Sequence, residues 1–204
     1  TGGAVVRSLV ELRGRGSVKT AIFGGTFNPV HNGHLHLAIS VCAELRYDKV
    51  IFVPANFSPH KEVDDLIANL HRLTMVRRAI ADYSFLSVDE CELDRGGVSY
   101  TIDTVRYLGS TYGRLGVIIG DDLVADYSSW RQASELALEA DLILGRRKDN
   151  SALLPFPHQG VSNVRLPISS QLIRERLRTG QAVDYLIPSP VLSYIVEHGL
   201  YQDR

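Results

Sequence analysis

The sequence lacks the features that would tie it to a membrane or to a polyanion. Its 22 basic and 23 acidic side chains leave a formal net charge of -1, so no overall field attracts it to nucleic acid. No apolar run approaches the roughly 18 residues that span a bilayer, and the first residues show no export signal. We therefore expect a cytoplasmic protein that binds neither a nucleic acid polymer nor a membrane.

Cysteine is scarce as well. Cys42 and Cys91 lie far apart in apolar segments, without Cys-x-x-Cys spacing, so we expect free thiols and no disulfide. What the chain has instead is apolar side chains, which make up 45% of 204 residues, enough for the core of one domain. We expect residues 1–17 to be an N-terminal extension and residues 18–204 to form a single domain. Self-association is left open.

Short apolar runs alternate with segments of helical periodicity along the domain. The first run, residues 18–23, ends at Gly24 and Gly25, where we expect a tight turn and then a helix. Further strands are predicted at residues 49–54, 86–91, 115–120 and 141–147. Helices are predicted at residues 66–81, 101–112 and 132–140, with two more near the C-terminus, and residues 155–163 resemble a surface loop. This alternation predicts an α/β fold with a doubly wound parallel sheet and a small C-terminal helical part.

Ligands of such a sheet bind beyond the carboxyl ends of its strands. Three segments lie where a predicted strand ends and a helix begins: GGTFNPVHNGH (24–34), GDD (120–122) and ISSQLIR (168–174). Glycine allows a close approach of the backbone, and helix N-termini favour anions. The segments therefore predict a phosphate site, although they match neither GxGxxG nor the P-loop.

The histidines of the first segment have two competing interpretations. His31, His34 and His36 could bind a metal, but residues two apart on a helix point to different sides, and no Cys, Asp or Glu lies nearby. They could also cap a packed loop, since histidine is often partly buried. Phosphate binding is favoured over both.

The first segment resembles the signature of the nucleotidylyltransferase superfamily, whose HxGH motif, here residues 31–34, binds nucleotide phosphates. PHK at 59–61, SYTIDT at 99–104, GDDL at 120–123 followed by Trp130, and ISSQLIR occur in the order seen in bacterial nicotinate-nucleotide adenylyltransferases. The resemblance covers about residues 19–201. It implies a Rossmann-like fold and transfer of the adenylyl group of ATP to nicotinate mononucleotide, giving deamido-NAD and pyrophosphate in NAD biosynthesis.

The same resemblance implies three groups of site residues. The catalytic group is His31, His34 and Arg174. The ATP-binding group is Gly24, Gly25, Thr26, Phe27, Gly120, Asp122, Ser169 and Ser170. The acceptor-binding group is Lys61, Thr101 and Trp130, with Trp130 stacking on the pyridine ring. Mg²⁺ is implied as a cofactor that accompanies ATP rather than as a metal held by protein ligands. Gln171 replaces the usual Thr, and Asn28 stands where Asp is also common.

The sequence offers hydrogen-bond donors rather than an activated nucleophile, since it has no GxSxG elbow. We therefore predict direct in-line attack of the mononucleotide phosphate on the α-phosphorus of ATP. His34 would stabilise the α-phosphate, while His31 and Arg174 would stabilise the leaving phosphates. The alternatives are transfer to nicotinamide mononucleotide or phosphopantetheine, a nonenzymatic nucleotide sensor, and a zinc-binding interaction domain.

Overall fold

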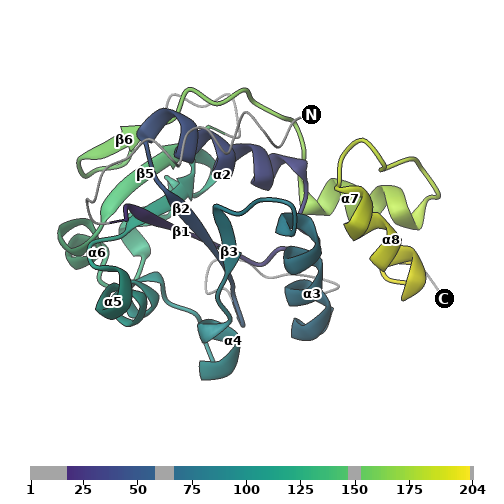
Figure 1. The fold of residues 1–204 in the computed structure, drawn as a ribbon, viewed down its shortest axis with the longest axis horizontal. Coiled ribbons are helices and arrows are strands. Elements are labelled where there is room, and N and C mark those ends of the chain that lie inside the picture. Colours follow the sequence, from purple (N-terminus) through teal and green to yellow (C-terminus); the bar gives the residue numbers. More distant parts are fainter. Residues whose placement is uncertain (1–17, 58–66, 147–152, 203–204) are drawn as a thin grey trace.

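One parallel sheet organises the protein. The computed structural model describes residues 18–57, 67–146 and 153–202; the predicted extension at 1–17 lies outside them. The strands are β1 (Thr20–Gly25), β2 (Lys49–Pro54), β3 (Leu86–Val88), β4 (Gly116–Gly120), β5 (Asp141–Gly145) and β6 (His158–Gly160). Their order is β3-β2-β1-β4-β5-β6, with every described pair parallel (Figure 1). The order reverses between β1 and β4, so the doubly wound, Rossmann-like sheet is confirmed.

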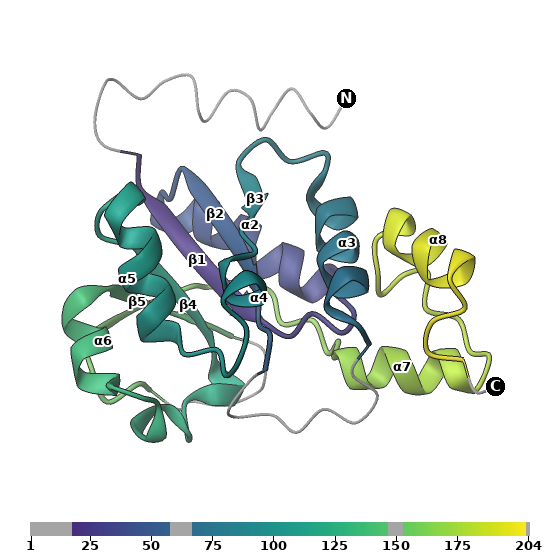
Figure 2. The ribbon, with the colours of Figure 1, turned by 90° about the horizontal axis from the view of Figure 1, so that it is seen from below.

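Helices cover both faces of this sheet (Figure 2). The helices are α2 (Asn32–Leu45), α3 (Asn69–Ile80), α4 (Cys91–Arg95), α5 (Thr101–Tyr112), α6 (Ala133–Glu139), α7 (Ser170–Arg178) and α8 (Ser189–Glu197). Strand side chains alternate between two cores: Phe52 packs in the cluster that includes α2 and α3, whereas Ile51 packs in the cluster that includes α5 and α6. Burial on both faces explains why the central strands are continuous apolar runs. None of the described helices has the length and apolar character that crossing a bilayer requires.

Several predicted boundaries need correction. β1 does not stop at residue 23, because Gly24 and Gly25 continue the ladder opposite Val53 and Pro54. β3 ends at Val88 rather than at the predicted residue 91, where the short helix α4 begins. The prediction of a surface loop at 155–163 was wrong in part, because residues 158–160 pair with β5 as an edge strand.

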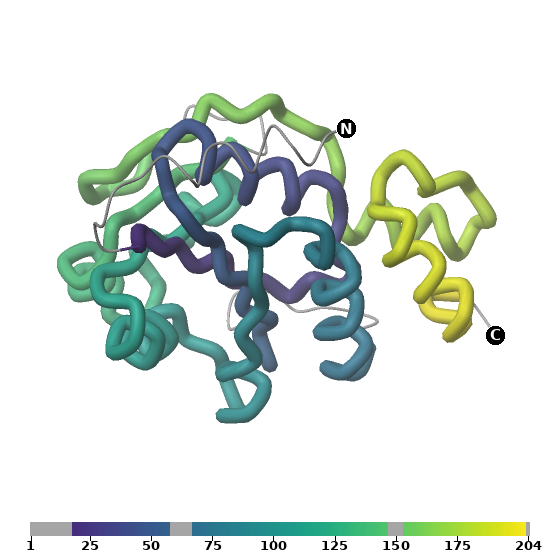
Figure 3. The backbone as a smooth tube through the Cα atoms, viewed as in Figure 1, coloured from purple at the N-terminus to yellow at the C-terminus, as the bar shows by residue number. Residues whose placement is uncertain are grey.

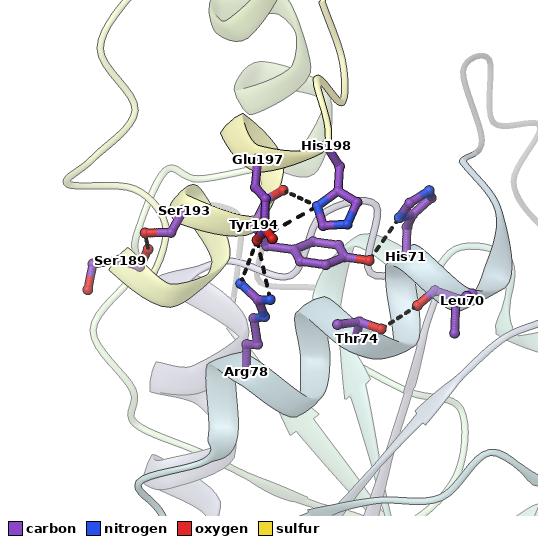
Figure 4. Close-up of polar contacts among 9 residues, drawn as sticks. All are labelled: Leu70, His71, Thr74, Arg78, Ser189, Ser193, Tyr194, Glu197 and His198. Carbon is purple, nitrogen blue, oxygen red and sulfur yellow. Dashed lines mark hydrogen bonds and ion pairs between the residues drawn. The ribbon is translucent and has the colours of Figure 1, made fainter.

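The C-terminal helices α7 and α8 lie beside the sheet rather than over a face of it (Figures 1 and 3). α8 packs against α3, where the Tyr194 hydroxyl lies 2.9 Å from His71 Nδ1 (Figure 4). The Arg78 guanidinium lies 4.5 Å above the Tyr194 ring and 3.4 Å from Glu197 Oε2. These contacts and the buried α8 side chains Val191 and Ile195 join the C-terminal part to the main core.

Candidate active site

A cavity of about 1180 Å³ lies at the carboxyl ends of β1 and β4, where the strand order reverses. Phe23, Gly24 and Gly25 line it from β1, and Ile118 and Gly120 line it from β4. This is the position at which doubly wound sheets bind their ligands. Its volume exceeds the roughly 300 to 1000 Å³ that is usual for a cavity that takes one drug-sized ligand.

The cavity brings together most of the residues that the sequence singled out. The predicted residues on its wall are Gly24, Gly25, Thr26, Phe27, His34, Thr101, Gly120, Asp122, Trp130, Ser169, Ser170 and Arg174. His31 is not part of the wall, and Lys61 lies outside the described residues. The ATP group and the two described acceptor residues, Thr101 and Trp130, thus face the same space, although Gly24 and Trp130 are about 100 residues apart in sequence.

The glycines and Phe27 shape the loop that follows β1. A Cβ atom on Gly25 would lie 2.9 Å from the Phe27 ring, so this position has room for glycine alone. A Cβ atom on Gly24 would meet nothing within 4 Å, which leaves this stretch of backbone open to a ligand. Phe27 itself has a left-handed φ of 50°, an uncommon conformation for a bulky residue. The centroid of its ring lies 5.4 Å from that of Phe52 and 5.1 Å from that of His34. This packing holds the loop backbone at the cavity.

The two histidines of the HxGH motif take different places. His31, at the start of α2, is fully buried and stacks on His34 with ring centroids 3.7 Å apart. Gly33 allows this stacking, because a Cβ atom there would lie 3.0 Å from His31 Nδ1. His34 Nδ1 accepts a hydrogen bond of 3.2 Å from the His31 backbone N–H. A neutral His34 therefore carries its proton on Nε2, where it can donate to a ligand, while His31 lies behind it.

The C-terminal part holds the same loop from the other side. Ser170 Oγ donates to the Pro29 carbonyl at 2.8 Å, and Arg174 Nη1 donates to the Asn28 carbonyl at 2.8 Å. The Tyr201 hydroxyl donates to Asn28 Oδ1 at 2.7 Å. Ser170 and Arg174, which the sequence assigned to ATP, thus line the cavity and also fix the loop.

The N-terminus of α7 opens on the cavity. Ser169 caps this helix, its Oγ accepting a hydrogen bond of 3.1 Å from the Leu172 N–H. Gln171, which replaces the usual Thr, also lines the cavity, so an amide is present at the position where the hydroxyl is missing. The first turn of α7 therefore presents both backbone N–H groups and polar side chains to the cavity.

The opposite side of the cavity is aromatic and basic. Trp130 is half-buried and lies with its ring centroid 5.2 Å from that of the buried Tyr127. The Arg131 guanidinium lies 4.7 Å from the centre of the Tyr100 ring. Thr101 is the first residue of α5, a helix of 12 residues whose N-cap makes no side-chain hydrogen bond. An aromatic face and a helix N-terminus therefore meet at this wall.

Sequence reasoning missed two ionisable residues. Glu92, only 5% exposed, lines the cavity and accepts a hydrogen bond from Thr104. Burial raises the pKa of its carboxyl group, whereas the hydrogen bonds from Thr104 and Ser99 act to lower it. Arg72, in α3, is fully buried behind the loop. Both occur in charged helical stretches that resemble solvent-exposed faces, so the sequence carries no signal for their burial.

The described part of the cavity offers no set of side chains that would hold a metal ion by itself. The described parts of the chain contain no group of three or more His, Cys, Asp or Glu residues that could hold a metal. Mg²⁺ usually takes one or two carboxylates and completes its shell with phosphate oxygens and water.

Comparison with known proteins supports one family from the sequence and one fold from the structure. Residues 22–176 match the family model described as cytidylyltransferase-like. The chain is 37% identical over 203 residues to a Treponema pallidum protein named "Probable nicotinate-nucleotide adenylyltransferase", covering 91% of this chain and 100% of that one. A protein of the same name from Borreliella afzelii is 36% identical over 187 residues, covering 90% and 97%.

Two solved structures share the fold. The Plasmodium falciparum nicotinic acid mononucleotide adenylyltransferase complexed with NaAD superposes with a TM-score of 0.74 at 20% identity, covering 90% of this chain and 97% of that one. The same enzyme complexed with APC gives a TM-score of 0.71 at 20% identity, covering 90% and 96%. At this identity the likeness establishes the fold alone.

Proposed function

We propose the function of this chain from one premise: the chain belongs to the nicotinate-nucleotide adenylyltransferase family, among the cytidylyltransferase-like proteins. It transfers the adenylyl group of ATP to nicotinate mononucleotide, giving deamido-NAD and pyrophosphate in NAD biosynthesis. The observation that carries this proposal is the single cavity faced by both predicted groups of residues, since the transfer requires both substrates side by side.

ATP would lie in front of β1, where the open side of Gly24 lets its phosphates approach the backbone. His34 Nε2 would donate to the α-phosphate. The N-terminus of α7, with Ser169, Ser170 and Arg174, would bind the leaving phosphates, since backbone N–H groups and the helix dipole favour anions there. Gly120, at the end of β4, and Asp122 just beyond it would bind the adenosine.

Nicotinate mononucleotide would lie against the opposite wall. The N-terminus of α5, at Thr101, favours the nicotinate carboxylate over the neutral nicotinamide group, because a helix N-terminus stabilises negative charge. Trp130 would stack on the pyridine ring. Lys61 keeps its assignment to the acceptor from the family motif, in a part of the chain outside the described residues.

The transfer proceeds by in-line displacement. A phosphate oxygen of the mononucleotide attacks the α-phosphorus, the bond to the bridging oxygen breaks, and pyrophosphate leaves without a covalent enzyme intermediate. His34 stabilises the charge on the α-phosphate as the geometry inverts. His31 would reach the leaving phosphates only by rotating out of its stack on His34. Bound magnesium supplies charge neutralisation on the phosphates.

An acceptor-preference assay tests the proposal. Purified protein with ATP and MgCl₂ is given nicotinate mononucleotide, nicotinamide mononucleotide or phosphopantetheine, and pyrophosphate and the dinucleotide are measured. We expect the highest kcat/KM with nicotinate mononucleotide. A preference for another acceptor would reassign the substrate, and ATP binding without pyrophosphate release from any of them would favour a sensor. Stoichiometric zinc in the purified protein would favour an interaction domain.

A further inference from the structure

Arg72 is a fully buried cation without a carboxylate partner among the described residues. Its Nη1 donates to the Thr26 carbonyl at 2.7 Å and its Nη2 to Asn69 Oδ1, while Nε has no partner in the described chain. Burial lowers its pKa, but an arginine starts far enough above neutrality to stay charged. Buried charges are usually paired, because leaving one uncompensated costs several kcal/mol. Arg72 therefore requires a counter-charge.

The loop in front of Arg72 does not provide one. Residues 24–34 contain no Asp or Glu. A second guanidinium, that of Arg174, binds the Asn28 carbonyl of the same loop. The Tyr201 phenol lies close to both: burial raises its pKa, and the charges of Arg174 and Arg72 act in the opposite direction. Arg72 thus leaves a positive charge behind the loop that an anion in the cavity would balance.

Arg72 also determines how one peptide of the loop is turned. Arg72 is not part of the cavity wall, whereas Thr26 and Phe27 are. The carbonyl and the N–H of a trans peptide point in opposite directions. Because the Thr26 carbonyl points to Arg72, the Phe27 N–H points to the other side of the loop. Within the described chain this N–H donates to no acceptor, so it is available to a ligand.

We propose that Arg72 is a positioning residue for the triphosphate of ATP, acting through the loop as a buried counter-charge and by turning the Thr26–Phe27 peptide toward the cavity. The proposal rests on the proposed function, which identifies the anion. Its two effects are separable. The charge attracts the triphosphate before and during the reaction, so it lowers KM for ATP. The peptide orientation affects alignment, so it raises kcat.

Three substitutions test this proposal. Arg72→Gln removes the charge, Arg72→Lys keeps it, and Arg77→Gln removes an exposed arginine of the same helix that pairs with Glu90 at 2.9 Å. We expect Arg72→Gln to raise KM for ATP about tenfold, as for the loss of one charge-assisted interaction. Arg72→Lys should stay within about threefold of wild type in KM for ATP but lose kcat, because an ammonium lacks the planar fork. Arg77→Gln should change neither constant by more than about twofold, as for an exposed pair.

Calorimetric titration with ATP, without any acceptor, keeps the test independent of the transfer reaction. A weaker ATP affinity in folded Arg72→Gln supports the counter-charge even if another acceptor is found. ATP affinity and kcat within twofold of wild type in that variant would overturn the proposal. If Arg72→Gln does not fold, Arg72→Lys decides: near-normal ATP affinity supports the role of the charge, and a tenfold loss overturns it.

Discussion

Replacing His34 by alanine tests the chemistry of the loop most directly. The ring lines the cavity at 8% exposure, and its Nδ1 is engaged by the His31 N–H at 3.2 Å. In the proposed mechanism Nε2 would donate to the α-phosphate. His34→Ala removes this donor together with the acceptor for the His31 N–H.

The two losses have different sizes. Removing one donor that acts in the transition state lowers kcat by about 100- to 1000-fold, or roughly 2.7 to 4 kcal/mol. Removing the acceptor leaves the buried His31 N–H unsatisfied, which destabilises the fold by about 1 to 3 kcal/mol. Pyrophosphate release at saturating ATP measures the first effect, and thermal denaturation without ligand measures the second. We expect a large fall in kcat in a protein that remains folded at the assay temperature.

His36→Ala is the matched control. His36 lies on the same helix but faces a small pocket away from the cavity, beside Leu37 and Asn163. We expect its kcat within about twofold of wild type, since His36 does not line the cavity. Normal kcat in a folded His34→Ala protein would refute the role of Nε2, and an equal loss in His36→Ala would show that the effect is not specific to the cavity.

Three further predictions concern the acceptor wall and its surroundings. Trp130→Ala should weaken the binding of nicotinate mononucleotide by about 1 to 3 kcal/mol, seen as a higher KM for it, and leave KM for ATP unchanged. An unchanged KM for the mononucleotide in steady-state kinetics would make Trp130 a packing residue. Because the folded pKa of Glu92 is raised, its charged form penalises the fold, and the free energy of unfolding should fall as pH rises from about 4.5 through that pKa. Denaturant titrations should show this loss reduced in Glu92→Gln, and an identical pH slope in both proteins would contradict the burial argument. Burial and Asp89 raise the pKa of the Cys91 thiol to about 12, so mass spectrometry should find it barely alkylated by iodoacetamide at pH 8, and rapid labelling would contradict this pKa.

The sequence predicted the strongly patterned elements best. β2 (Lys49–Pro54) and α5 (Thr101–Tyr112) have the predicted bounds, because an apolar run and a helical period stand between clear breaks. The predicted turn at Gly24 and Gly25 was wrong, because both residues pair with β2 as part of β1. The edge strand His158–Gly160 has mostly exposed side chains and depends on pairing with β5, a long-range contact that no local pattern encodes.

The sequence also predicted the candidate site only in part. Motif residues such as His34 and Ser170 were predicted to share a site, and they line one cavity. The motif could not predict that His31 is buried behind His34, since that depends on packing over Gly33. Nor could the segment HRLTMVRRAI separate buried Arg72 from exposed Arg77, because both have helical neighbours and the same charge. Burial of a charge is decided by tertiary contacts.

The loop after β1 depends on contacts from α3 and from the C-terminal part. The carbonyls of Thr26 and Asn28 bind Arg72 and Arg174, and the Asn32 N–H donates to the Leu186 carbonyl at 2.9 Å. These contacts fix the loop through α3 and through the C-terminal part, and α3 and α8 are themselves packed together (Figure 4). In-line transfer is sensitive to displacements of about 1 Å, so we expect the packing of α8 on α3 to affect catalysis as well as stability. The C-terminal helical part therefore belongs to the candidate active site through Ser169, Ser170 and Arg174, although α8 contributes no residue to the cavity wall.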